Sequence, residues 1–275
     1  MTPFSAQGYS GRGRSRLRRA GADAESRRVI EIRGRTTLVG LLGRPTSHSL
    51  SPTMQNAGFE ALGLDWAYVP LPTPPELLRD AVRGLVAVGF AGANVTIPHK
   101  EAVIELCDEL DEVAQRAGSV NTLVIRDGRV HGSSTDGLAV TTQIEAEGRR
   151  ALVLGTGGAA KAVAAALEEA GAEVVVRGRR DPGWPPSGEG FDVLVNATPV
   201  KDELIVAPRA GMQVVDLAYL PDGRPTALIA AAQALDCHPC VDGLDVLLAQ
   251  GAASFERWTG KPAPLVAMRA ALRFR

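Results

Sequence analysis

The feature that most constrains the fold is a glycine-rich turn between an apolar strand and a helix. Residues 151–154 form a short apolar run, and a helical pattern continues from the turn to about residue 170 before a second strand at 173–176. The turn itself reads Gly155-Thr-Gly157-Gly158-Ala159-Ala. In this strand–turn–helix–strand order, glycines let backbone N–H groups approach a pyrophosphate at the helix N-terminus. The sequence therefore predicts a Rossmann-like, dinucleotide-binding unit.

The end of the second strand favours one class of dinucleotide. An NAD site expects an acidic residue about 20 positions after the first glycine, to bind the ribose 2′-hydroxyl. Here the strand ends in Arg177-Gly-Arg179-Arg180. Guanidinium groups suit a 2′-phosphate, so we expect NADP. A solvated basic turn is the alternative, and Asp181 would favour NAD if the loop turned it inward.

A polar loop precedes this unit in the chain. Asn94-Val-Thr96-Ile-Pro98-His-Lys100 follows an apolar run and leads into an amphipathic one, so the pattern predicts strand, loop and a helix from Pro98. That helix would bury Val103, Ile104, Cys107 and Leu110. An amide, a hydroxyl and an ammonium group would then lie at the carboxyl edge of a sheet. The alternative is a solvated Lys100, although a helix N-terminus is the wrong end of the dipole for a cation.

The preceding segments predict alternating strands and helices. Residues 37–43 read as a strand and lead to Ser49-Leu-Ser51-Pro52, where Ser51 is expected to cap a helix and Ser49 to stay free for a ligand. A strand at 65–71 is followed by Thr73-Pro-Pro-Glu76, which predicts a capping box. This βαβα order predicts a largely parallel sheet.

The following segments add a hairpin and further helices. Asp127-Gly128 predicts a hairpin turn, and its outgoing arm ends at Asp136, which would cap a helix to about Glu147. Strands are expected at 191–196 and 214–219, with a helix at 226–235 after them. The last predicted helix ends at Gly260 and buries one apolar face, with Gln250 as a polar exception that is alternatively a surface glutamine.

Composition excludes some classes of protein. No apolar run reaches the ~18 residues that a membrane span needs. Residues 1–35 carry nine arginines and three acidic residues, a net charge of +6, so the remainder of this −1 chain is acidic and is not expected to bind nucleic acid. The arginine-rich segment is expected to be a disordered extension, with a nucleic-acid arm or a transit peptide as alternatives. The three cysteines fit a reducing cytoplasm, and Cys237-His-Pro-Cys240 alone is weak support for a metal or redox site, so we expect no metal.

Several stretches, taken in order, resemble the shikimate dehydrogenase family. They are Ser-His-Ser-Leu-Ser-Pro, Asn-Val-Thr-Ile-Pro-His-Lys, Gly-Ser-Val-Asn-Thr, Ser-Thr-Asp-Gly, the glycine-rich turn, Asn-Ala-Thr-Pro and Asp-Gly-Leu-x-x-Leu-Leu-x-Gln. The resemblance covers about residues 37–260 and implies a two-domain α/β fold. A substrate domain would comprise residues 36–136 and the C-terminal helices in 245–275, and a Rossmann-like NADP domain would comprise residues 137–244.

The resemblance also implies residue roles. Lys100 and Asp136 would be the catalytic pair, and Ser49 and Ser51 would bind the substrate carboxylate. The other substrate contacts would be Thr96, Asn121, Tyr219 and Gln250. From the glycine-rich turn, the basic strand end and the later loops, we expect the cofactor contacts to be Gly155, Gly157, Gly158, Ala159, Arg177, Arg179, Arg180, Thr198 and Gly243. The chain departs from the family pattern where Arg177–Arg180 replaces Asn-Arg-Thr, at Lys201, and at Asp245-Val246.

The implied function is reversible, NADPH-dependent reduction of 3-dehydroshikimate to shikimate in chorismate and aromatic amino-acid biosynthesis. The enzyme would be cytoplasmic, a monomer or a homodimer, and would bind neither nucleic acid nor membrane. An NAD-dependent quinate/shikimate dehydrogenase, an aminoshikimate dehydrogenase, or a ligand-sensing paralogue without turnover remain alternatives.

Overall fold

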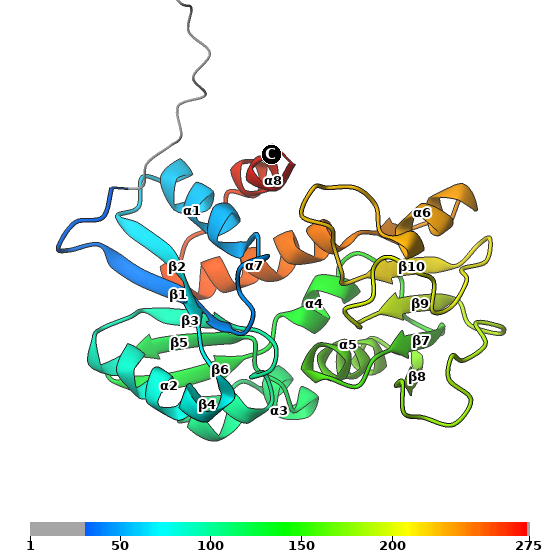
Figure 1. Cartoon of the computed structure of the whole chain (residues 1–275), viewed down its shortest axis with the longest axis horizontal. Helices are drawn as coiled ribbons and strands as arrows, with labels where there is room; N and C mark the ends of the chain where they lie inside the picture. Colours follow the sequence, from blue (N-terminus) through cyan, green and yellow to red (C-terminus); the bar gives the residue numbers. More distant parts are fainter. Residues whose placement is uncertain (1–30, 274–275) are drawn as a thin grey trace, which may run out of the picture. The chain divides into compact units, whose positions relative to one another are not determined.

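A computed structural model describes residues 31–273 of the 275-residue chain. Of the extension predicted at residues 1–35, residues 1–30 lie outside this range. The described chain forms two sheets with helices on both faces of each, which confirms the predicted α/β class (Figure 1). Within the described range, no helix has the length and apolar character to cross a membrane.

The first sheet has six strands in the order β2-β1-β3-β5-β6-β4. They are β1 (Thr37–Gly43), β2 (Trp66–Pro72), β3 (Gly92–Val95), β4 (Glu109–Leu110), β5 (Thr122–Arg126) and β6 (Arg129–Ser133). β1 is parallel to β2 and β3, but β5 is antiparallel to β3 and β6. The predicted parallel arrangement is therefore confirmed for β1, β2 and β3, and β4 is also parallel to β6, whereas both antiparallel pairs involve the hairpin strand β5. The confirmed hairpin at Asp127-Gly128, with φ values of 51° and 74°, reverses the chain.

Helices cover both faces of this sheet. On one side lie α1 (Ser51–Ala61) and α8 (Leu265–Arg273), and on the other lie α2 (Leu78–Ala87) and α3 (Glu112–Ala117) (Figure 1). Strand side chains alternate between the two layers. Val39 and Leu41 pack toward Phe59 of α1, whereas Leu42 packs with the apolar face of α2.

The second sheet is parallel throughout, in the order β11-β10-β9-β7-β8. Its strands are β7 (Arg150–Leu154), β8 (Glu173–Arg177), β9 (Val193–Asn196), β10 (Gln213–Asp216) and β11 (Cys240–Val241). The helices α4 (Asp136–Thr141), α5 (Gly158–Glu169) and α6 (Ala227–Ala234) cover it. The strand–glycine turn–helix–strand unit predicted from the sequence is therefore confirmed.

The helix α7 (Gly243–Thr259) contributes to both halves (Figure 1). Val246, near its start, packs in the core of the second sheet, whereas Phe255 and Trp258 pack with α1 and the first sheet. One rigid helix therefore carries its middle residues, including Gln250, to the junction between the two sheets.

Two predicted helix starts are wrong. Pro98 lies in a turn and is followed by the 3₁₀ helix η2 (Ala102–Leu106), while Leu110 belongs to β4. The carbonyl of Lys100 accepts a hydrogen bond from the Val120 N–H, so it is not part of a helical ladder. The predicted capping box also fails, because the Thr73 hydroxyl donates to Leu71 O and the chain enters the 3₁₀ helix η1 (Pro75–Leu77) before α2.

The caps expected from Ser51 and Asp136 are also absent from those residues. Leu50 and Thr135 occupy the N-cap positions, and Ser51 and Asp136 are the first helical residues. α4 ends at Thr141 rather than near Glu147. Side chains that bond the preceding turn, such as Thr142 Oγ1 to Leu138 O at 2.8 Å, compete with continuation of the helix.

Candidate functional site

The centre of the candidate site is a partly enclosed ion pair. Lys100 Nζ lies 2.5 Å from Asp136 Oδ2, and the two side chains are 13% and 8% exposed. Lys100 comes from the loop after β3, and Asp136 comes from the first turn of α4. The fold therefore brings the two predicted catalytic residues into direct contact across 36 positions of sequence.

Asn121 orients this pair from the buried side. Its Nδ2 donates to Asp136 Oδ1 and to Thr135 Oγ1, both at 2.9 Å. Its Oδ1 accepts from the Thr135 N–H at 2.9 Å. A backbone N–H can only donate, so this contact fixes which end of the Asn121 amide faces Asp136. Both Nδ2 hydrogens are thus engaged, and a ligand hydroxyl would share one of them.

The predicted carboxylate-binding serines lie at the start of α1. Ser51 is buried, and its N–H donates to Ser49 Oγ at 3.2 Å. Ser49 Oγ thus accepts a hydrogen bond from the first residue of α1, and its hydroxyl can still donate to a ligand. Thr96 lies beyond the end of β3, where its backbone N–H bonds Leu42 O and its carbonyl accepts from His99.

Two predicted contacts approach from the other side of the junction. The Tyr219 hydroxyl accepts a hydrogen bond from the Leu50 N–H at 3.3 Å, which places it beside Ser49 and Ser51. Gln250 is half-buried on α7, and its Nε2 donates to Leu247 O at 3.0 Å. The main-chain carbonyl of Gln250 accepts a hydrogen bond from Thr135 Oγ1, so this turn of α7 is attached to the residue that precedes Asp136.

The glycine-rich turn ends at the N-terminus of α5. Gly155 has φ +118° and lies against the carbonyl of Ala197, whereas Gly157 is exposed and precedes the helix. A Cβ on Gly158 would be 2.7 Å from Ser119 Oγ and 2.8 Å from Lys100 Cβ. The helix N-terminus therefore packs directly against the loop of the ion pair, with Ala159 half-buried in its first turn.

The basic loop after β8 has a defined internal contact. Asp181 Oδ2 accepts from the Gly178 N–H at 2.8 Å, which closes the turn. Arg177 NH1 donates to Val176 O, and Arg177, Arg179 and Arg180 are exposed. The Asp181 carboxylate is thus engaged by the loop itself, and the guanidinium groups lie in solvent.

A buried carboxylate organises the ends of β9 and β10. Asp216 accepts from Asn196 Nδ2, Ala218 N and Thr226 Oγ1. Burial raises the pKa of Asp216 to about 6, although these hydrogen bonds act in the opposite direction. Thr198 donates to Asn196 Oδ1 at 2.7 Å, so its hydroxyl is held within the Asn-Ala-Thr-Pro loop.

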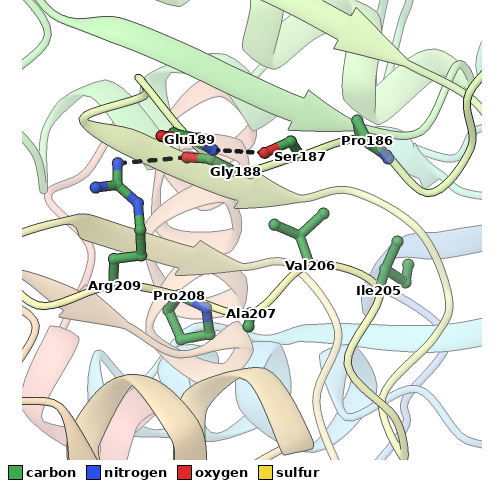
Figure 2. A pocket seen from close by; sticks show the side chains of 9 residues that line it. All are labelled: Pro186, Ser187, Gly188, Glu189, Ile205, Val206, Ala207, Pro208 and Arg209. Atoms are coloured by element: carbon green, nitrogen blue, oxygen red, sulfur yellow. Dashed lines mark hydrogen bonds between the residues drawn. The ribbon is translucent and has the colours of Figure 1, made fainter.

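Gly243 is required by packing at the same edge. A Cβ at this position would lie 2.2 Å from the carbonyl oxygen of Ala218. A pocket of about 120 Å³ lies beside it and contains two of the predicted residues, Tyr219 and Gly243. A second pocket, of about 470 Å³, lies between residues 186–189 and 205–209 and contains none of them (Figure 2).

The cysteines have little thiolate character. Burial raises the pKa of Cys107 to about 12, and it also raises the pKa values of Cys237 and Cys240. Among residues 31–273, no cluster of three or more His, Cys, Asp or Glu side chains is arranged to hold a metal ion.

The sequence reasoning missed residues that hold the site together. Thr135 lies within the quoted Ser-Thr-Asp-Gly stretch, and Asn94 opens the polar loop, so both had a local signal. Thr122 had one too, as the last residue of the quoted Gly-Ser-Val-Asn-Thr stretch. Tyr68 and Ser254 had none, because a single polar residue on an apolar strand or helix face does not indicate what it will meet.

Comparisons with known proteins cover nearly the whole chain. Residues 41–123 match the model for the shikimate dehydrogenase substrate binding domain, and residues 243–273 match the shikimate 5′-dehydrogenase C-terminal domain. A shikimate dehydrogenase (NADP(+)) of Rubrobacter xylanophilus is 44% identical over 283 residues, covering 89% of this chain and 98% of that protein.

Solved structures give the same result. The shikimate dehydrogenase of Aquifex aeolicus aligns with a TM-score of 0.80 at 32% identity, covering 89% of this chain and 100% of the other. The shikimate 5-dehydrogenase of Thermus thermophilus, solved in complex with shikimate, aligns with a TM-score of 0.77 at 34% identity, covering 86% of this chain and 98% of the other.

Proposed function

The chain belongs to the shikimate dehydrogenase family, and on that premise we propose that it catalyses the reversible NADPH-dependent reduction of 3-dehydroshikimate to shikimate. The observation that carries this proposal is the Lys100–Asp136 ion pair, 2.5 Å long, packed against the N-terminus of α5. Reduction of a ring ketone needs a hydride on carbon and a proton on oxygen, and both must arrive at one place.

The proton is the contribution of the ion pair. As the ketone oxygen becomes a hydroxyl, Lys100 Nζ and the Asp136 carboxylate together supply the proton, and in the reverse direction they accept it. Asn121 donates a hydrogen bond to Asp136 Oδ1, and this contact keeps Asp136 Oδ2 directed at Lys100. A cation beside the reacting oxygen also stabilises the negative charge that develops there.

Substrate orientation is the contribution of the surrounding polar groups. We propose that the hydroxyls of Ser49 and Ser51 bind the carboxylate, with Tyr219 against the same loop. Thr96, Asn121 and Gln250 would contact the ring hydroxyls. To contact a ring hydroxyl, the side-chain amide of Gln250 has to give up its hydrogen bond to Leu247 O, which is a single bond within α7.

The residues of the second half fit NADP. Gly157 leaves the N-terminus of α5 open, since a Cβ there would meet no described atom within 4 Å, and the first turn contains no acidic residue. Backbone N–H groups at such a terminus bind a pyrophosphate. The 2′-phosphate would be bound by Arg179 and Arg180, with Arg177 at the strand end. When bound, NADPH supplies the hydride. Thr198 and Gly243 would shape the nicotinamide side.

The remaining parts of the proposal concern organisation. A substrate domain would comprise residues 36–136 with the C-terminal helices, and a cofactor domain would comprise residues 137–244. The protein would act in the cytoplasm as a monomer or homodimer, and it would bind neither nucleic acid nor membrane.

The test is a steady-state assay of the purified full chain. Shikimate oxidation should be fastest with NADP, and quinate should be a poorer substrate. A preference for NAD with comparable turnover of quinate would replace this proposal with the quinate/shikimate alternative. Binding of shikimate without turnover of either cofactor would instead indicate a ligand-sensing protein.

A further inference from the structure

A second group of polar side chains lies buried beneath the candidate site. Asn94 of β3, Thr122 of β5 and Ser254 of α7 are 4%, 0% and 0% exposed. Asn94 Nδ2 is 2.8 Å from Ser254 Oγ and 3.2 Å from Thr122 Oγ1, and the two hydroxyls are 2.8 Å apart. We call these three residues the buried polar cluster. They come from three elements, and Asn94 and Ser254 are 160 positions apart in the sequence.

The orientation of the Asn94 amide in the cluster is determined. Asn94 Nδ2 faces the main-chain carbonyl of Asn121 at 3.1 Å, and a carbonyl can only accept. Asn94 Oδ1 therefore faces Tyr68, whose hydroxyl donates to it at 3.0 Å. The amide of Asn94 is thus fixed at both ends, and it presents its donors to the cluster.

The cluster continues to the ion pair. Thr122 Oγ1 donates to Asn121 Oδ1 at 3.0 Å, which is the same oxygen that accepts from the Thr135 N–H. The opposite end of the amide, Asn121 Nδ2, donates to Asp136 Oδ1, and Asp136 Oδ2 receives Lys100. Thr122 is therefore three hydrogen bonds from Lys100 Nζ.

Ser254 extends the cluster to α7. Its hydroxyl is 3.0 Å from Gln250 O, the carbonyl that also accepts from Thr135 Oγ1. Apolar side chains of the same shape could replace the whole cluster at little or no cost in stability, because no buried polar group would then be left unpaired. What such side chains would not supply is a fixed direction for the Asn121 amide.

We propose that Asn94, Thr122 and Ser254 are positioning residues that keep the Asn121 amide aimed at Asp136, and thereby hold Asp136 in register with Lys100. The inference rests on the proposed function for its effect on turnover. The hydroxyl of Thr122 is the decisive group, because it alone in the cluster bonds the Asn121 side chain.

The first test compares two substitutions of Thr122. Thr122→Val keeps the shape and removes the hydroxyl, and it should lower kcat about tenfold with shikimate KM changed less than about threefold, as expected for a hydrogen bond that acts on the reacting groups. Thr122→Ser restores the hydroxyl and should restore kcat to within about twofold. A loss of kcat in both variants would assign Thr122 to packing and overturn the proposal.

Ser254 offers a matched control on its own helix. Ser254 and Thr259 both bond the carbonyl four residues earlier, at 3.0 and 2.9 Å, but only Ser254 contacts Thr122 and Asn94. Ser254→Ala should lower kcat by about three- to tenfold, and Thr259→Ala should leave it unchanged. Equal kcat values in the two variants would contradict a positioning role for Ser254.

A second readout is independent of turnover. The chain has four lysines, at positions 100, 161, 201 and 261, so reductive ¹³C-methylation gives few signals, and Lys100→Arg identifies the one from Lys100. In Thr122→Val the chemical shift of the Lys100 signal should change while those of the other three lysines stay the same. In Thr122→Ser the Lys100 signal should have its wild-type chemical shift. An unmoved Lys100 resonance overturns the proposal even if the wild type fails to oxidise shikimate, a failure that would by itself overturn only the proposed function.

Discussion

At the scale of single residues, the enclosure of the Lys100–Asp136 pair predicts a large effect on turnover. Lys100→Ala removes the proposed proton donor and its positive charge, so kcat should fall by roughly 10²–10⁴. Shikimate KM should change much less. The substitution also leaves a buried carboxylate without its cation, at a cost of about 3–5 kcal/mol, so the folded fraction must be measured alongside the kinetics.

The control for this prediction is a lysine in an ion pair of the same length. Lys161 lies 2.5 Å from Glu101, but the two side chains are 46% and 48% exposed. Lys161→Ala should keep kcat within a few-fold and cost little stability, because exposed pairs contribute about 0–1 kcal/mol. If both lysines gave equal losses, Lys100 would not have a special chemical role.

Cofactor choice is also a residue-scale property. Asp181 is bonded to the Gly178 N–H, so it does not occupy the place of the acidic residue that favours NAD. Arg179 is exposed on the same turn, and one charge-assisted contact of about 1.5–3 kcal/mol corresponds to roughly 10- to 100-fold preference for NADP. Arg179→Ala should lower the ratio of kcat/KM for NADP over NAD by this factor.

Arg177→Ala is the comparison, because Arg177 already donates to Val176 O beside the strand end. It should change the cofactor ratio less than Arg179→Ala does. The opposite order would move the phosphate contact to Arg177, and a wild type that prefers NAD would reject the arginine argument as a whole.

At the scale of elements, the sequence predicted the strands and the βαβ unit well but misplaced several helix starts. Apolar runs such as residues 37–43 and the glycine-rich turn are local signals, and the structure has both. The segment after Pro98 failed because Lys100 O bonds Val120 N, a partner twenty positions away. Ser51 failed as a cap because it is itself the first helical residue and Leu50 occupies the N-cap position.

In the candidate site, too, the local signals were predicted and the long-range contacts were not. Motifs named Lys100 and Asp136, whereas the contacts that orient them come from Thr122, Thr135 and Ser254 in three different parts of the chain. Their roles depend on register between β3, β5 and α7, which no local pattern encodes. The sequence therefore predicted which two residues, Lys100 and Asp136, lie together at one site, but not the contacts that hold them there.

The contact between α5 and the Lys100 loop gives an element-scale prediction. Gly158→Ala would place a methyl group 2.7 Å from Ser119 Oγ and 2.8 Å from Lys100 Cβ, so α5 or the loop must shift. The substitution should cost about 1–3 kcal/mol and lower kcat as well as raise NADP KM. Urea unfolding and steady-state kinetics measure the two effects.

Gly157→Ala separates the effect of this turn on stability from its effect on NADP binding. Gly157 has φ −81° and ψ 177°, an extended conformation open to any residue. A Cβ there would meet no described atom within 4 Å. Stability should stay within about 0.5 kcal/mol, while NADP KM rises because the methyl group enters the space expected for the pyrophosphate. Unchanged NADP KM would place the pyrophosphate elsewhere.

At the scale of the whole molecule, the free energy of unfolding should depend on one buried carboxylate. Asp216 is fully buried where β10 meets the loops of Asn196 and Thr226, and burial raises its pKa to about 6 from an ordinary value of 3.8. The folded protein therefore binds this proton more tightly than the unfolded chain does. The resulting stabilisation is fully present below about pH 4 and is lost as pH rises to about 6.

Asp216→Asn tests this dependence, because asparagine keeps an oxygen for Asn196 and Ala218 and places its amide toward Thr226 Oγ1, which can accept. The other titratable groups are present in both proteins, so their contributions cancel when the two unfolding free energies are subtracted. Between pH 4 and pH 7 the wild type should lose about 2 kcal/mol relative to Asp216→Asn, because most of a shift of about two pKa units is titrated over this range. Urea unfolding at half-unit steps of pH measures the difference. A constant difference across that range would mean that Asp216 titrates alike in the folded and unfolded chain, and a wild type that gained stability with rising pH would reverse the sign of the argument.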